Sequence, residues 1–231
     1  MSLKKCLFSI PFSYDITPPM KRFLLISDVY CPWCYAFDAQ LRPFLSSHPD
    51  WPIQVWCGNL IYDPVTLADM LEQYPDMERF YKLLTKKTGA VIGSAHLKAL
   101  TDQSQNFPMH SIMADYAFVA IRELLPDRAL DVLEAFHKTL YVEGKNLLDE
   151  TVQIDIAQSL GVSKEAFLRS LANPEVEEKV YEESETAEEL MGEFLLYPTL
   201  YAQTSEDEFH FIARGYVLTD TVEKAFQELH L

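Results

Sequence analysis

The stretch "SDVYCPWCYAFDAQL", residues 27–41, places Cys31 and Cys34 three residues apart between two apolar segments. The segment before it, "RFLLISDVY", is short and rich in branched and aromatic residues, which is typical of a buried strand. After the cysteines, apolar residues follow a helical spacing to about Ser47, where "HPDWP" ends the helix. The segment "IQVWCGNL", residues 53–60, alternates like a second strand. This order predicts a βαβ unit with parallel strands.

Helical patterns dominate the middle of the chain. In the segment 173–192, Asn173 is placed to cap a helix, Pro174 fits its first turn and Gly192 is placed to end it. Its apolar residues form one stripe opposite a face of glutamates, so we assign this stripe to the core: Val176, Val180, Ala187, Leu190 and Met191.

The C-terminal part predicts a hairpin and a final helix. The strands are "FLLYPTLYAQ" and "EFHFIARG", separated by "TSED". The helix is "TDTVEKAFQELHL", with Thr219 or Asp220 as its cap. The whole pattern predicts an α/β fold whose mixed sheet is interrupted by a large all-helical insertion domain. The expected parts are an N-terminal segment (1–20) that is mobile, the first part of the sheet domain (21–63), the helical insertion with its connecting helix (64–189), and the second part of the sheet domain (190–231).

The composition restricts which binding partners and which cellular compartment we expect for the protein. The net charge is −16, from 19 basic and 35 acidic residues, and it would repel nucleic acid and anionic membranes. No segment approaches the roughly 18 apolar residues that cross a bilayer. Lys4 and Lys5 precede a short apolar patch that lacks a cleavage site, so we expect no export signal and a cytoplasmic protein. In a reducing compartment a close cysteine pair is more often catalytic or metal-binding than structural.

Zinc binding and a structural disulfide fit the cysteine pair poorly. A structural zinc site needs four ligands, but Cys6, Cys57 and the six histidines all stand apart in the sequence. We therefore predict no metal site. A disulfide that closes so short a loop would remove little entropy from the unfolded chain. We expect Cys57 to be a small buried residue and Cys6 to lie in the mobile segment.

Redox chemistry fits the position of the pair. Cys31 stands at a strand-to-helix junction, where unpaired N–H groups and the helix dipole favour a thiolate that solvent reaches. Pro32 suits the first helical turn, and Cys34 lies one turn further inside. A CxxC motif beside a βαβ unit is typical of thioredoxin-like proteins. Such a site also needs a proline, normally cis, at the start of the opposite strand. Pro198 is the candidate, although an ordinary edge-strand proline is the alternative.

Three segments, "SDVYCPWCYAF", "YVEGKNLLDETVQIDIAQSLGVSKEAFLRSL" and "YPTLYAQ", resemble the DsbA-like thioredoxin-fold oxidoreductases. The resemblance is closest to the cytosolic branch of predicted protein-disulfide isomerases, near the FrnE-type proteins. It runs from about residue 23 to the C-terminus and is loose between residues 62 and 105. It implies a thioredoxin fold with a helical insertion, Cys31 as nucleophile and Cys34 as resolving cysteine. It also implies a substrate site at Trp33, Tyr197 and the cis-proline Pro198.

The chain departs from this family at three positions. Trp33 stands where periplasmic members carry a thiolate-stabilising histidine, and Tyr197 stands where a small residue is usual. Leu25 occupies the position of the buried carboxylate that many thioredoxin-fold enzymes carry six residues before the nucleophile. Asp28 is then the candidate for a proton relay, with an exposed loop aspartate as the alternative.

The predicted function is that of a thiol–disulfide oxidoreductase, similar to disulfide isomerases and reductases. Its partners would be thiol- or disulfide-containing proteins or small molecules, with glutathione or a thioredoxin for recycling and no metal or organic cofactor. The alternative is a glutathione-dependent enzyme, because "NFPMHSIMADYAFVA" resembles a segment of kappa-class glutathione transferases and 2-hydroxychromene-2-carboxylate isomerases. That resemblance would place a glutathione pocket near His110 and Ser111, while His110 otherwise suits a helix cap or the core. A chaperone-like binding module is a third hypothesis.

Overall fold

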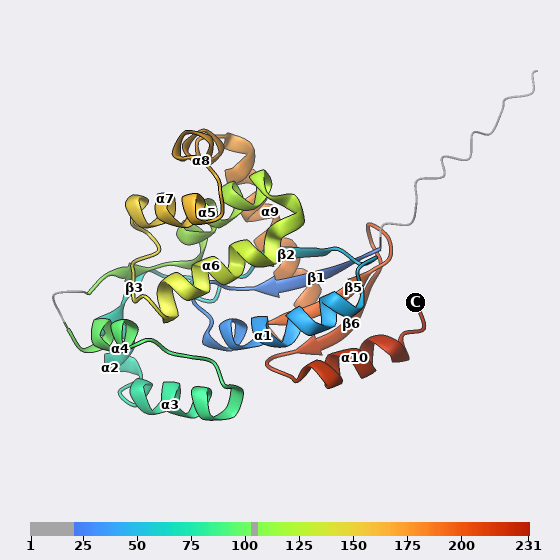
Figure 1. Cartoon of the computed structure of the whole chain (residues 1–231), viewed down its shortest axis with the longest axis horizontal. Coiled ribbons are helices and arrows are strands. Elements are labelled where there is room, and N and C mark those ends of the chain that lie inside the picture. Colours follow the sequence, from blue (N-terminus) through green and yellow to red (C-terminus); the bar gives the residue numbers. More distant parts are fainter. Residues whose placement is uncertain (1–20, 103–105) are drawn as a thin grey trace, which may run out of the picture.

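A four-stranded mixed sheet lies at the centre of the computed structural model, which describes residues 21–102 and 106–231 (Figure 1). The strand order is β2-β1-β5-β6. Strand β1 is parallel to β2 and antiparallel to β5, and β5 is antiparallel to β6. The strands are β1 (Arg22–Ser27), β2 (Ile53–Cys57), β5 (Thr199–Gln203) and β6 (Phe209–Arg214). The expectations for segment 1–20 and for Cys6 lie outside the described residues.

The predicted βαβ unit is present. Helix α1 (Pro32–Ser47) connects β1 to β2, and Ser27 at the end of β1 pairs with Cys57 at the end of β2. The cysteine pair therefore lies at the carboxyl end of the central strand. In parallel strand arrangements this edge of the sheet is where ligands usually bind.

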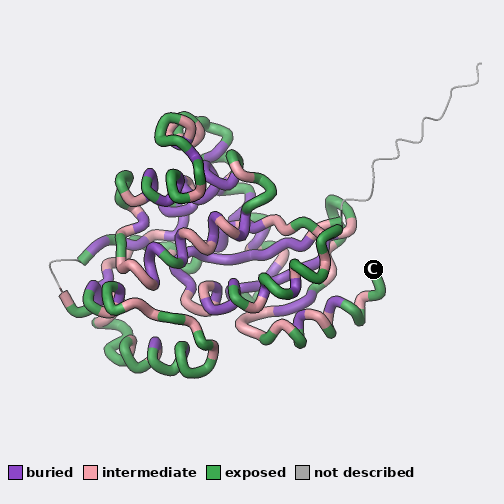
Figure 2. Tube along the Cα trace, in the orientation of Figure 1, coloured by how far each residue is buried: buried purple, intermediate pink, exposed green. Residues whose placement is uncertain are grey.

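Helices cover both faces of the sheet, so the central strands are buried on both sides (Figure 2). Phe23 in β1 contacts α1 and α10 (Thr219–Glu228), with ring centroids 4.8 Å from Phe44 and 5.0 Å from Phe226. The alternate residues of β1, Leu24 and Ile26, face the apolar side of α9 (Pro174–Met191). This alternation explains why β1 reads as a continuous apolar run.

The insertion consists mainly of helices. These are α2 (Leu67–Gln73), α3 (Met77–Thr88), α4 (Ser94–Thr101), α5 (Ser111–Leu124), a 3₁₀ turn at Pro126–Arg128, α6 (Ala129–Tyr141), α7 (Glu150–Ser159), α8 (Lys164–Leu171) and α9. It is not entirely helical, because β3 (Val65–Thr66) pairs with β4 (Pro108–Met109). The ladder is short, and Pro108 has no N–H to donate to it. Helix α9 has the predicted caps, Asn173 and Gly192.

Two boundaries near the C-terminus differ from the prediction. Strand β5 begins only at Thr199, and the preceding Phe194 to Leu196 are exposed instead of paired. The cap of α10 is Leu218, because the Thr219 hydroxyl donates to the Gln40 carbonyl of α1 at 2.9 Å. Thr219 therefore joins two helices and does not cap one.

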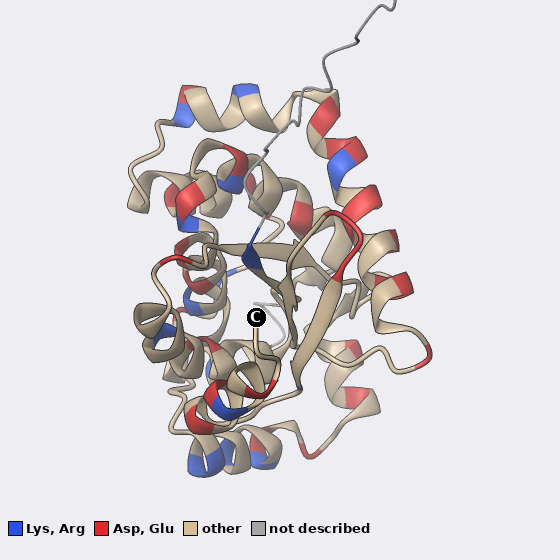
Figure 3. Cartoon of the chain, turned by 90° about the vertical axis from the view of Figure 1, so that its right-hand side faces the viewer, with Lys and Arg blue, Asp and Glu red and all other residues tan. Residues whose placement is uncertain are grey.

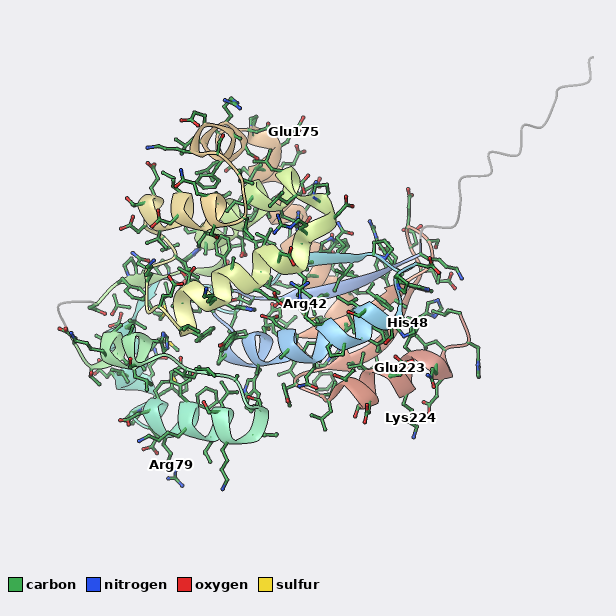
Figure 4. All side chains as sticks on the ribbon, viewed as in Figure 1. Arg42, His48, Arg79, Glu175, Glu223 and Lys224 are labelled. Carbon is green, nitrogen blue, oxygen red and sulfur yellow. The ribbon has the colours of Figure 1, made fainter. Side chains whose placement is uncertain are left out.

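Polar contacts near the surface hold α1 against its neighbours (Figure 4). His48, at the end of α1, lies 2.8 Å from the Glu223 carboxylate of α10. Arg42 of α1 contacts Asp131 and Glu134 of α6 at 2.5 Å. Acidic side chains elsewhere crowd helices such as α9 (Figure 3). Within the described residues, no helix is both long and apolar enough to cross a membrane.

Candidate active site

The two cysteines of the motif occupy the start of α1. Cys31 is the N-cap, with extended backbone angles (φ −89°, ψ 111°), and its Sγ accepts a hydrogen bond from the Cys34 N–H at 3.3 Å. Both are free thiols. Cys31 is only 4% exposed and Cys34 1%, so Cys31 is less open to solvent than expected. The covering group is the loop that carries Tyr197.

The Tyr197–Pro198 peptide bond is cis and lies directly before β5. The Cys31 thiol donates to the Tyr197 carbonyl across a 3.7 Å gap. Because β5 pairs with β1, the sheet itself brings this loop to the cysteine pair. Tyr197 and Pro198 are both buried there.

The bulky ring of Tyr197 fits because Gly58 lies beneath it. A Cβ on Gly58, just after β2, would collide with the ring. The Tyr197 hydroxyl accepts a hydrogen bond from the Asn59 N–H at 3.1 Å, and burial raises the pKa of this phenol to about 12. The loop after β2 thus fixes the residue whose carbonyl faces Cys31.

Asp28 is 1% exposed, so the alternative of an exposed loop aspartate is wrong. Its Oδ1 accepts the Tyr30 N–H at 2.8 Å and its Oδ2 accepts the Leu60 N–H at 2.9 Å. Burial raises the pKa of its carboxyl, although these hydrogen bonds oppose the shift. Asp28 joins the turn before Cys31 to the loop after β2.

A second set of buried polar groups supports the same turn. The His137 Nε2 lies 3.2 Å from the Asp28 carbonyl, and its Nδ1 lies 2.6 Å from the Asp38 carboxylate of α1. The Tyr141 hydroxyl donates to the Tyr30 carbonyl at 2.5 Å. Sequence analysis did not identify these groups. The available signal was a histidine and a tyrosine four residues apart on the apolar face of an amphipathic helix.

Trp33, between the two cysteines, is half-buried beside the insertion. Its ring centroid lies 6.0 Å from that of Phe80 on α3 and 6.2 Å from that of Tyr216. The Lys87 Nζ lies 5.3 Å from the same ring. Pro32 occupies the first turn of α1, as predicted.

His110 caps α5, in agreement with one of its two predicted roles. Its Nδ1 accepts the Met113 N–H at 3.2 Å. The neighbouring Ser111 is fully buried, and its hydroxyl accepts the Ile61 N–H at 2.9 Å. Ser111 therefore lies against the loop after β2, which also contacts Tyr197.

Burial raises the pKa of the other two described thiols, Cys34 and Cys57. Burial, and then the neighbouring Cys31, raise the pKa of Cys34 well above its usual value. Burial likewise raises the pKa of Cys57 well above its usual value, and Cys57 is 3% exposed, as predicted. Across residues 21–102 and 106–231, no three side chains of His, Cys, Asp or Glu are grouped to hold a metal ion.

Several solved structures share this fold. A candidate protein disulfide isomerase from Nitrosomonas europaea superposes with a TM-score of 0.76 at 15% identity, covering 91% of this chain and 97% of that one. The cytosolic disulfide reductase DsbM from Pseudomonas aeruginosa, solved with GSH, gives 0.67 at 18% identity, covering 91% and 100%. A 2-hydroxychromene-2-carboxylate isomerase gives 0.58 at 14% identity, covering 90% and 95%. At these identities the likeness shows the fold alone.

Comparison by sequence gives the family. No curated protein matches the chain. The DSBA-like thioredoxin domain family matches residues 24–191, which is well over half of the chain and includes the cysteine motif and the insertion. This chain therefore belongs to the DSBA-like thioredoxin domain family.

Proposed function

We propose that the chain is a thiol–disulfide oxidoreductase, similar to disulfide isomerases and reductases, with Cys31 as nucleophile and Cys34 as resolving cysteine. The asymmetry between the two thiols carries the proposal. The Cys31 Sγ sits at the start of α1 and accepts a backbone N–H, whereas burial holds Cys34 in its thiol form. The first attack therefore falls to Cys31.

The reaction proceeds through two exchanges. The Cys31 thiolate attacks one sulfur of a substrate disulfide, forming a mixed disulfide and releasing a substrate thiolate. Cys34 then loses its proton and attacks the Cys31 sulfur, which releases the second substrate thiolate. Two electrons pass to the substrate, and Cys31–Cys34 becomes a disulfide. Glutathione or a thioredoxin would return it to the dithiol.

Trp33, Tyr197 and Pro198 are the proposed substrate contacts. Among the described residues, the Tyr197 carbonyl accepts only the weak Cys31 thiol donor, so it is suited to a stronger N–H from an extended substrate. Asp28 is the proposed proton acceptor near the pair. We place the protein in the cytoplasm, which the similarity to the cytosolic reductase DsbM supports.

Trapping tests the proposal. In Cys34→Ser, the mixed disulfide on Cys31 has no resolving thiol and should accumulate, visible as adducts that dithiothreitol releases. Cys57→Ser is the matched control, because it removes a buried thiol that the mechanism does not use, and it should trap nothing. Absence of adducts from Cys34→Ser in cells and with oxidised glutathione would refute the proposed function.

A glutathione-dependent isomerase or transferase is the second candidate. It is favoured by the likeness to the 2-hydroxychromene-2-carboxylate isomerase and by the placement of Ser111, next to the cap residue His110, against the loop after β2. Such an enzyme would bind glutathione without thiol exchange. Saturable binding by a chain with both Cys31→Ser and Cys34→Ser would therefore favour this candidate.

A further inference from the structure

Two hydrogen-bond donors on one helix reach the backbone of the cysteine loop, which we define as residues 28–31. His137 and Tyr141 lie one turn apart on α6, and both are almost completely buried. The His137 Nε2 lies 3.2 Å from the Asp28 carbonyl, and the Tyr141 hydroxyl donates to the Tyr30 carbonyl at 2.5 Å. The insertion thus binds both ends of the turn that precedes the nucleophile.

The partners of His137 determine where its protons lie. A carbonyl oxygen only accepts, so the Nε2 facing Asp28 carries a hydrogen. The Nδ1 lies 2.6 Å from an Asp38 carboxylate oxygen, and one proton must be shared there, because otherwise two acceptors would face each other. The pair therefore carries no net charge. Burial alone lowers the pKa of His137, but Asp38 raises it overall, and burial raises the pKa of Asp38, which agrees with a shared proton.

We propose that His137, oriented by Asp38 and assisted by Tyr141, is a positioning residue that sets the reactivity of Cys31. The inference rests on the proposed function, in which Cys31 is the nucleophile. His137 acts from behind the loop and does not contact the thiol. Its role is to hold the backbone that aims the thiol.

The hydrogen bonds converge on the backbone that directs the sulfur. The Cys31 N–H donates to the Asp28 carbonyl at 3.0 Å, so one oxygen holds both Cys31 and His137. The Cys31 Sγ must also stay within reach of the Cys34 N–H at 3.3 Å. If the Asp28 carbonyl loses its side-chain donor, the turn gains freedom and the sulfur spends less time at this amide. The thiolate then loses the N–H that favours it.

Two amide substitutions of the same histidine separate positioning from bulk stability. In His137→Gln, the side-chain amide reaches the place of Nε2 and keeps a donor for the Asp28 carbonyl. In His137→Asn, the shorter amide reaches only the place of Nδ1, so the donor to Asp28 is lost. The measurement is the rate at which reduced Cys31 is alkylated between pH 5 and 9, mapped by mass spectrometry, together with each melting temperature.

We expect His137→Asn to slow alkylation at pH 7 by about fivefold, the value of one hydrogen bond, and to move the pH midpoint of the reaction upward. His137→Gln should restore the rate to within about twofold of the native chain. Equal rates and midpoints for the two variants would overturn the proposal, whatever their melting temperatures. A purely structural histidine would lower the melting temperature without separating the two profiles.

Tyr141→Phe provides a smaller change if both histidine variants fail to fold. It removes the hydroxyl that donates to the Tyr30 carbonyl and should slow the alkylation of Cys31, as His137→Asn does. An unchanged alkylation rate would overturn the proposal. Tyr116→Phe is its control, because the Tyr116 hydroxyl bonds only to Tyr181 between α5 and α9 among the described contacts. Cys31 alkylation needs no substrate protein, so normal alkylation of Cys31 combined with no trapped disulfide partner in Cys34→Ser would refute the proposed function alone.

Discussion

A single buried carboxyl, that of Asp115 on α5, makes the stability of the fold depend on pH. It is 0% exposed, and neither of its oxygens has a hydrogen bond to a described nitrogen or oxygen atom, although the Cys57 thiol lies beside it. Burial, and then the nearby Asp28, raise its pKa well above 3.8. The folded chain therefore holds a proton on Asp115 at a pH where the unfolded chain has released it.

The consequence is a pH-dependent loss of stability that Asp115→Asn removes. A carboxyl with a raised folded pKa contributes its full stability below the unfolded value of 3.8, and the contribution falls as pH rises toward the folded value. The free energy of unfolding of the native chain, relative to Asp115→Asn, should therefore fall by up to about 1.4 kcal/mol per pH unit above pH 4. Urea unfolding at pH 5 and pH 8 measures it. Asp155→Asn, at an exposed position, is the control. If the free energy of unfolding changed equally with pH in the native chain and in Asp115→Asn, the prediction would be wrong.

Some residues of the site could be predicted from the sequence, and others could not. Cys31, Cys34 and Pro198 could be predicted because a motif and a strand start are local patterns. His137 and Asp38 could not, because their contact joins positions 99 residues apart and depends on how α6 packs against α1. The same holds for Glu183, which lies on the predicted glutamate face of α9 and yet is buried.

At the scale of elements, the loop after β2 and the loop before β5 fit together at one glycine. Gly58 leaves the space that the Tyr197 ring fills, and the Asn59 N–H bonds to the hydroxyl of that ring. The bulky residue before Pro198 is therefore matched to a residue without a side chain.

Gly58→Ala should displace the Tyr197 ring and with it the carbonyl that faces Cys31. We expect a loss of about 1–3 kcal/mol of stability, as for other overpacked sites. The double variant Gly58→Ala with Tyr197→Val should recover most of this loss, since the smaller side chain leaves room for the new methyl group. Denaturant unfolding of the three chains measures both steps. No recovery in the double variant would show that the ring is not the cause.

Helix α9 is attached to the sheet by a buried ion pair. Arg122 of α5 makes two contacts of 2.7 Å with the Glu183 carboxylate and donates to the Val55 carbonyl of β2 at 2.5 Å. Three elements therefore depend on one guanidinium group. Burial raises the pKa of Glu183, and the pairing with Arg122 opposes that shift.

Glu183→Ala should destabilise the chain by about 3–5 kcal/mol, because it leaves the Arg122 charge buried without its partner. Glu182→Ala, one residue earlier on the exposed side of α9, is the matched control and should change stability by less than about 0.5 kcal/mol. Unfolding in guanidinium chloride measures the stability of both variants. Similar midpoints for both variants would mean that solvent reaches Arg122.

At the scale of the molecule, the charge balance sets how the fold responds to salt. The net charge of −16 makes the compact state repel itself near neutral pH. The buried ion pairs are screened less than the surface charges. Surface repulsion should therefore dominate the effect of salt.

Adding 0.2 M sodium chloride at pH 8 should raise the melting temperature, because the Debye length falls to under about 10 Å and the repulsion weakens. Near pH 5 the acidic groups begin to take up protons, so the same addition should have a smaller effect. Melting curves at low and high salt at the two pH values test this. A fall in melting temperature with salt at pH 8 would show that attractive surface pairs outweigh the repulsion.

The order of elements could be predicted from the sequence, and their placement in space only in part. The βαβ start, the hairpin and α9 all carry local signals of periodicity, caps and turns. Two features of the fold have no such local signal in the sequence. The β3–β4 ladder has two residues in each strand, too few for a pattern, and the packing of α9 on the face of β1 opposite α1 depends on contacts far apart in the sequence.

Strand β1 lies between β2 and β5, and a ribosome delivers these two neighbours at very different times. Strand β2 follows after one helix, whereas β5 follows only after the whole insertion. Until then one edge of β1 is open, and no Tyr197 carbonyl stands over Cys31. Open edges are where foreign strands pair. A growing chain therefore carries Cys31 without the Tyr197 carbonyl through most of its synthesis, and the loop proposed to contact substrates arrives only after the whole insertion.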